Sequence, residues 1–158
     1  MNNQIINEDV IFTTKKSHLT EKEIDDIIPY FFEGKEYFIQ FYLNYNGMIF
    51  PNIAFFYRDL FYEVSKDEYN LLSIEAFFAI NNSNSTIFSI WNAVKENNRV
   101  KMFANYHIPF AINSSGDIFW IELPTGKIKY ICMETPDNII LVAPSFIDFC
   151  RGIQANIR

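Results

Sequence analysis

Apolar and polar residues follow two different periods along this chain, and the periods separate helices from strands. Apolar residues recur at helical spacing between residues 35 and 45, and the Asn46-Gly47 pair that follows is typical of a helix end. Earlier in the chain, Thr20 precedes Glu23 by three residues, which is the pattern of a capping box. It predicts a first helix over about residues 21–28.

Two further helices are predicted in the second half of the chain. Ser85 or Thr86 can cap a helix over residues 86–98, in which Ile87, Ile90, Trp91 and Val94 share one face. Near the C-terminus, Ala143-Pro144-Ser145 predicts a helix start, and Gly152 predicts its end.

Shorter apolar runs predict strands between these helices. The sheet begins at residues 48–50 and continues through 53–64 and 70–80, although 70–80 also fits a helix. Residues 100–104 and 108–112 are expected to supply further strands. Pro109 places the second of these at a sheet edge or at a strand start, because proline cannot donate a ladder hydrogen bond.

A β-hairpin is predicted over residues 117–133, with Pro124-Thr125-Gly126 in its turn. One register pairs Leu123 with Ile128, Ile121 with Tyr130 and Phe119 with Cys132 on an apolar face. It sets Glu122 opposite Lys129 on the other face, which is a favourable pair. A hairpin loop one residue shorter would pair apolar with charged side chains on both faces, so we prefer the first register. Both Trp120 and Glu122 then lie on the outer face.

Composition and charge narrow the class of protein. The 158 residues fit one domain, with residues 1–18 as a polar lead-in and 19–158 as the folded unit. A net charge of −6 argues against direct nucleic-acid binding and favours a basic protein partner. No membrane-spanning run and no signal peptide are expected, so the predicted location is the cytoplasm.

The search for catalytic and metal-binding motifs predicts neither a cofactor nor a metal site. Two histidines and two cysteines at these spacings do not form a zinc site. A nucleophilic pair of Cys150 with His107 requires that the fold bring them together, and a structural role for His107 is favoured. Asp117, after Gly116, is expected to bond turn backbone.

A partner-binding surface is the alternative to an active site. Trp120 on the outer face of the hairpin, flanked by carboxylates, is the kind of aromatic that leads protein recognition. The candidate binding residues are Trp120, Glu122, Glu134 and Asp137. The competing interpretation is that a second layer of helices covers Trp120.

Several short motifs, taken in order, resemble the SUKH superfamily, the Smi/Knr-like domain. They are Asn46-Gly47, Ile108-Pro109-Phe110-Ala111, Gly116-Asp117-Ile118-Phe119, Glu122-Leu123, Gly126 and Ser145-Phe146. The chain departs from the family pattern at Ile28-Pro29, where the family often has Leu-Pro, and at Gly47-Met48, where it often has a second glycine.

The resemblance implies an α+β fold in which helices pack on a multistranded, mainly antiparallel sheet. It also implies a non-enzymatic immunity protein that binds and neutralises a cognate bacterial toxin, often a nuclease. The alternative it leaves open is a regulatory or scaffold domain that binds a cellular partner or a small ligand. Neither the toxin nor the oligomeric state follows from the sequence.

Overall fold

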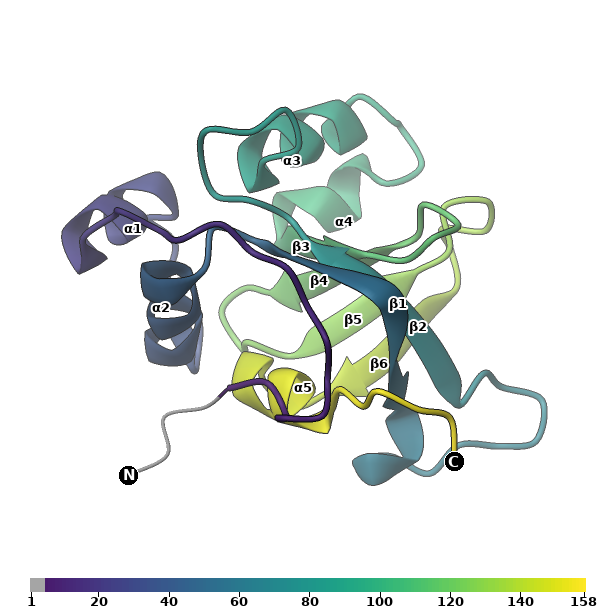
Figure 1. The fold of residues 1–158 in the computed structure, drawn as a ribbon. Coiled ribbons are helices and arrows are strands. Elements are labelled where there is room, and N and C mark those ends of the chain that lie inside the picture. Colours follow the sequence, from purple (N-terminus) through teal and green to yellow (C-terminus); the bar gives the residue numbers. More distant parts are fainter. Residues whose placement is uncertain (1–4) are drawn as a thin grey trace.

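A six-stranded antiparallel sheet, with its strands in chain order from β1 to β6, organises the computed structural model, which describes residues 5–158 (Figure 1). The predicted α+β class with a mainly antiparallel sheet is therefore confirmed. The elements are α1 (Glu21–Ile27), α2 (Lys35–Asn44), β1 (Met48–Tyr57), the short 3-10 helix η1 (Arg58–Leu60), β2 (Leu71–Phe77), α3 (Ile87–Lys95), α4 (Lys101–Asn105), β3 (His107–Ile112), β4 (Ile118–Glu122), β5 (Ile128–Ile131), β6 (Ile139–Ala143) and α5 (Phe146–Gly152).

Helices cover both faces of the middle of the sheet (Figure 1). On one face, Phe149 of α5 packs against Phe119 of β4 and Phe110 of β3, with ring centroids 5.3 and 5.5 Å apart. On the other face, Phe103 of α4 meets Trp120 edge-on at 5.2 Å. Successive residues of a strand point to opposite faces, so Phe119 and Trp120 are both fully buried.

The predicted helix starts are confirmed. Thr20 and Glu23 form the capping box of α1, and Thr86 caps α3 together with Ser89. The side chain of Ser145 accepts a hydrogen bond from the Asp148 N–H and so caps α5. Residues 71–77 are a strand, which decides the 70–80 segment in favour of the sheet.

The strand prediction for residues 100–104 is wrong, because this segment forms α4. Its buried residues, Val100 and Ala104, lie four positions apart, which is one helical turn. The indole of Trp91 donates a hydrogen bond of 2.7 Å to the Ala104 carbonyl and joins α4 to α3. Five residues, of which only Lys101 is polar, are too few to reveal a helical period in the sequence.

The edge position that Pro109 suggested for β3 is also wrong, since β3 lies between β2 and β4. The ladder with β2 begins only at Ala111 and Ile112, beyond the proline. An irregularity in the ladder with β4 separates Pro109 from Ala111. Pro109 therefore stands near the strand start, where the missing N–H costs no bond to β2.

The faces of the hairpin are as predicted, but its register differs by two residues. Phe119 pairs with Tyr130, and Ile121 pairs with Ile128. Leu123 leaves the ladder, because its N–H donates to the Tyr106 carbonyl. The turn is also tied to the α1–α2 connection, where the Glu33 N–H donates to the Pro124 carbonyl. A shift by two keeps every side chain on its face, so only the pairing partners change.

Residues 5–18 run along the folded unit as irregular chain with a turn at residues 8–9. Ile5, Ile6 and Val10 are buried, and isolated bridges join Thr13 to Ile49 and Lys16 to Tyr45. The apolar residues 10–12 do not form a strand of the sheet. The N-terminal segment thus adds side chains to the core without extending the six-stranded sheet.

Replacing Phe119 by alanine should lower the free energy of unfolding by about 3–5 kcal/mol, because it removes a fully buried ring between α5 and Tyr130. Denaturant unfolding of both proteins measures this loss. Phe31, which is 67% exposed, is the control, and its change to alanine should cost far less. A loss below about 1 kcal/mol at Phe119 would contradict the packing described above.

Candidate partner-binding site

The expectation that Trp120 is exposed on an open sheet face is wrong. Its side chain is fully buried beneath α4, and its indole N–H has no hydrogen-bond partner among residues 5–158. The alternative interpretation, a second helix layer over this face, is the correct one. A signal for it was present in the sequence, because residues 118–121 are an unbroken apolar run, which is typical of a strand buried on both sides.

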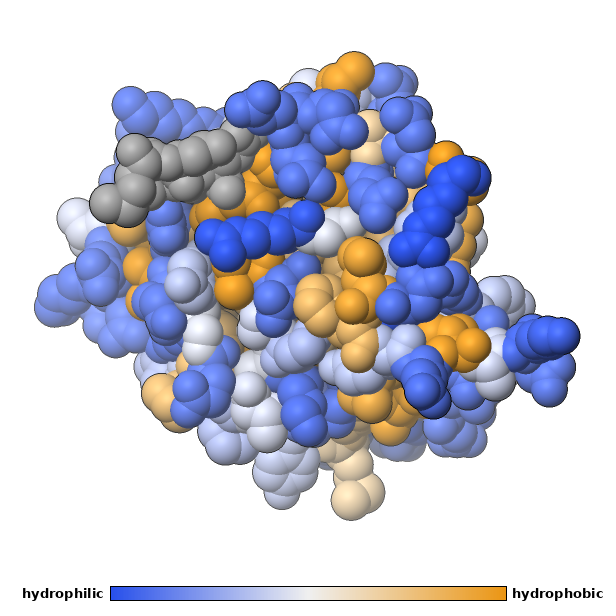
Figure 2. All heavy atoms as spheres, turned by 90° about the horizontal axis from the view of Figure 1, so that it is seen from below, coloured by the Kyte–Doolittle hydropathy of each residue, from blue (hydrophilic) through white to orange (hydrophobic). Residues whose placement is uncertain are grey.

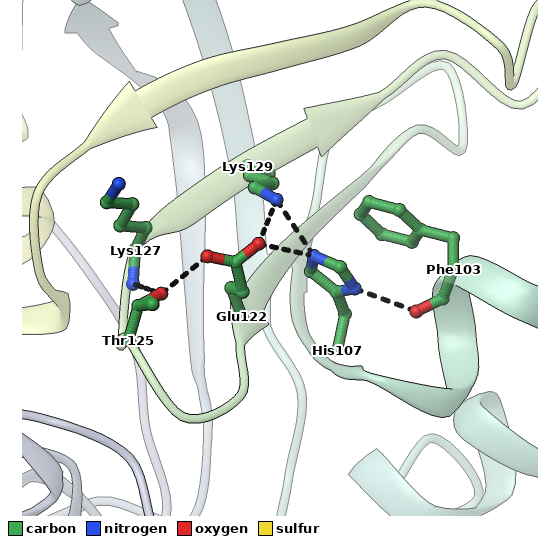
Figure 3. Close-up of polar contacts among 6 residues, drawn as sticks. All are labelled: Phe103, His107, Glu122, Thr125, Lys127 and Lys129. Carbon is green, nitrogen blue, oxygen red and sulfur yellow. Dashed lines mark hydrogen bonds and ion pairs between the residues drawn. The ribbon is translucent and has the colours of Figure 1, made fainter.

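Glu122 ends β4 and belongs to a polar cluster with Thr125, Lys129 and His107 (Figure 3). Its carboxylate forms an ion pair with Lys129 and accepts a hydrogen bond of 2.6 Å from the Thr125 hydroxyl. Burial alone would raise the pKa of Glu122, but these bonds outweigh it and hold the pKa below its ordinary value. The predicted link between Glu122 and Lys129 exists, as a diagonal contact.

His107 begins β3 and lies flat on the ring of Phe103, with centroids 3.6 Å apart. Its Nδ1 lies 2.7 Å from the Phe103 carbonyl, so this nitrogen carries the proton and Nε2 is the acceptor for Lys129 at 3.2 Å (Figure 3). Burial, aided by the Lys129 charge, lowers the pKa of His107 to about 4, although the bond with Phe103 and the Glu122 charge oppose this. His107 is therefore neutral at pH 7 and has a structural role.

Glu134 and Asp137 lie in the exposed loop between β5 and β6, at the opposite end of the hairpin from Glu122. Asp137, 88% exposed, pairs with Arg99 of the α3–α4 connection at 3.5 Å. The structure therefore divides the four predicted residues: Trp120 is internal, Glu122 closes one end of the hairpin, and Glu134 and Asp137 lie together at the other.

A pocket of about 860 Å³ opens beside this loop. Its walls come from the β1–β2 connection, the β3–β4 turn and the β5–β6 loop, which are far apart in the sequence. Lining residues from these three segments include Arg58, Tyr69, Asn113, Asp117, Thr135 and Asn138. A concave site built from loops on a rigid sheet is the usual form of a binding site.

Asp117 and Tyr130 form the buried polar side of the pocket. The Tyr130 hydroxyl donates to Asp117 at 2.9 Å, and the Met133 N–H donates to the second carboxylate oxygen at 2.9 Å. Asn113 contacts the same tyrosine at 3.0 Å. Burial and the neighbouring Asp117 raise the pKa of Tyr130, so the phenol stays protonated. The prediction that the Asp117 side chain bonds its own turn backbone is therefore wrong. Its carboxylate bonds the backbone of the loop after β5, and the Asn113 side chain accepts the turn N–H groups of Ser115 and Asp117 instead.

Arg58 also lines the pocket, and it joins the two edges of the sheet. Its Nε donates to the Leu141 carbonyl of β6 at 2.6 Å, and its Nη1 donates to the Tyr69 carbonyl at 2.8 Å. Nη1 also lies 3.3 Å from the Glu68 carboxylate. Sequence reasoning missed this residue, although Arg58 is the one basic side chain in the stretch 53–64.

The remaining candidates for chemistry do not converge. Cys150 is buried on α5, and burial raises the pKa of its thiol well above the ordinary value. No hydrogen bond joins it to His107 within residues 5–158. Nor does the described part of the chain contain a group of three His, Cys, Asp or Glu side chains that could hold a metal ion.

The model of the SMI1 / KNR4 family (SUKH-1) matches residues 35–152, which is more than half of the chain. The chain belongs to this family. No curated protein and no solved structure matches it. The SUKH-1 match includes every segment that lines the pocket.

Lowering the pH from about 7.5 to 5 should reduce the free energy of unfolding by about 1–2 kcal/mol through His107. Its pKa is about 4 when folded and 6.5 when unfolded, so the unfolded chain binds more protons between these values. The stabilisation is complete above pH 6.5 and is lost as the pH falls towards 4. Partial solvent screening keeps the effect below the full linkage value.

Urea unfolding at several pH values tests this dependence. His107→Gln should remove most of it, whereas the exposed His18, changed to glutamine in the same way, is the control and should leave it in place. A wild-type stability that stays constant over this pH range would show that His107 titrates normally in the folded protein.

Proposed function

We propose that this SUKH-1 protein is a non-enzymatic immunity protein that binds and neutralises a cognate toxin in the cytoplasm. The family is known for immunity proteins, and immunity of this kind requires binding without catalysis. The observation that carries the proposal is the acidic pocket at one end of the sheet, lined by Asp67, Glu68 and Asp117 and bordered by the loop of Glu134 and Asp137.

Charge complementarity indicates a basic partner. The chain has a net charge of −6, and Arg58 is the one base among the described residues that line the pocket. A toxin that acts on nucleic acid needs a basic surface for phosphate groups, so a nuclease domain fits this acidic face. Opposite fields would also speed encounter between the two proteins.

The proposed interface differs from the one expected from sequence in its aromatic residue. Trp120 is internal, whereas Tyr69, at the pocket rim, is 76% exposed and can supply the aromatic contact. Glu134 and Asp137 stay in the proposed site. Glu122 is only 23% exposed and already paired, so we assign it a secondary place at the other end of the hairpin.

Other faces of the molecule compete less well for this role. Figure 2 shows the molecule from below the view of Figure 1. On this face, outside the grey atoms, hydrophobic residues form separate patches among hydrophilic ones. Such scattered apolar residues are normal for a protein surface. In residues 5–158 there is no helix with the length and hydrophobicity that a membrane crossing needs.

Neutralising Glu134 and Asp137 together, as Glu134→Gln with Asp137→Asn, should slow association with the toxin about 3–10-fold at low salt. The reason is that charges at an interface rim act mainly on the encounter rate. Stopped-flow or surface-based kinetics with the cognate toxin domain provides the measurement. Raising the salt concentration should reduce the difference between the variants.

The matched control is Glu21→Gln with Glu36→Gln. It also removes two negative charges, but from the exposed starts of α1 and α2. An equal slowing in the control would contradict the assignment of the face. Failure of the chain to protect cells that express the toxin, together with recovery of a resident cellular enzyme on affinity purification, would contradict the immunity function itself.

A further inference from the structure

The pocket contains a buried carboxylate with no cation beside it. Asp117 is 8% exposed, and no ion pair joins it to any lysine, arginine or histidine of residues 5–158. Its neighbours are neutral donors, namely the Tyr130 hydroxyl, the Met133 N–H and, at 3.5 Å, the side-chain amide of Asn113. Burying a charge is costly unless it is paired, so a cation that enters the pocket gains an interaction that the free protein leaves unmade.

Arg58, which also lines the pocket, supplies a second unused group. Its side chain is 7% exposed, and Nε and Nη1 are engaged by Leu141, Tyr69 and Glu68. Nη2 makes no hydrogen bond with any described residue. An arginine that lines a pocket with one nitrogen unengaged is ready to donate to a carbonyl oxygen of a guest.

We infer that the pocket receives one basic residue of the toxin, with its side-chain cation beside Asp117 and Asp67 and its backbone carbonyl accepting a hydrogen bond from Arg58 Nη2. This inference rests on the proposed function and names the contact that the partner makes. Arginine fits better than lysine, because its planar group donates to several acceptors at once and can stack on the exposed ring of Tyr69.

The charges of the pocket argue against a free anion as the natural guest. Phosphate or a carboxylate could pair with Arg58, but it would face Asp67, Glu68 and Asp117 in the same space. Glu68 already offsets the Arg58 charge at 3.3 Å. The lining therefore holds two carboxylates, Asp67 and Asp117, for which the described residues offer no ion-pair partner.

The test uses acetyl-arginine-methylamide as the probe and acetyl-citrulline-methylamide as its uncharged counterpart of the same shape. Titrating each into the full ¹⁵N-labelled chain should give saturable amide shifts around residues 67–73, 113–117 and 138–140 with the arginine probe. Binding of the citrulline probe should be at least about fivefold weaker, because it lacks the charge. Equal binding of the two, or arginine shifts centred on α1 and α2, would overturn the inference.

Variants separate the two groups that hold the guest. Asp67→Asn changes an exposed residue and should weaken the arginine probe about 3–10-fold, while Glu21→Gln, the matched control, should leave it unchanged. If the Asp117→Asn variant still unfolds cooperatively, it should bind the arginine probe more weakly than the Asp67→Asn variant does. If it does not fold, the Asp67→Asn variant alone decides whether the cation lies where we propose. No effect of Asp67→Asn would contradict the proposed placement of the cation.

Binding of the arginine probe and protection from the toxin are separate measurements, so either can fail while the other succeeds. A chain that protects cells and binds the toxin, yet shows no saturable shift with the arginine probe, would remain an immunity protein that recognises its toxin elsewhere. Arginine binding in the pocket without protection from any neighbouring toxin would instead retain the site and reject the immunity role.

Discussion

Burial of the central strands on both faces is the constraint on which this fold depends. α5 places Phe146 and Phe149 against one face, and α3 with α4 closes the other over Trp120. Removing the aromatic surface on both faces from water supplies much of the driving force for folding a chain of this size. It also leaves the middle of the sheet closed to partners. The recognition site that we propose accordingly lies in the loops at one end of the sheet.

Arg58 connects this framework to the candidate site. By bonding a carbonyl of β6 from the end of β1, it draws the first and last strands of the sheet towards each other. The same side chain bonds the β1–β2 connection at Tyr69, so the position of that pocket wall depends on it. Burying a guanidinium is expensive, and its several bonds to carbonyl oxygens offset that cost.

Two polar clusters at opposite ends of the β4–β5 hairpin illustrate the difference between a group that stabilises and a group that can bind. Glu122, Lys129 and His107 satisfy one another, and their charges are balanced within the protein. Asp117 has hydrogen bonds but no opposite charge among the described residues. A balanced cluster leaves no charge for a partner to neutralise, whereas a buried carboxylate without an opposite charge does.

What the sequence determined by itself was local. Capping residues such as Thr20 and Ser145 set the helix starts, because a cap acts within four residues. Alternation assigned Phe119 and Glu122 to opposite faces, and the order of motifs identified the SUKH relationship. The caps and the alternation depend on neighbours along the chain, and the order of motifs is a property of the sequence alone, so all three could be predicted without a structure.

Tertiary structure decided the rest. The register of the hairpin depended on bonds from its turn to Tyr106 and Glu33, which lie far away in sequence. The burial of Trp120 depended on α4, a helix too short for its period to be visible. The pocket depended on three segments, around residues 58–73, 113–117 and 130–140, that meet only when the sheet curls. No local sequence pattern encodes the contacts between these segments, because the energy that brings them together comes from packing the whole sheet.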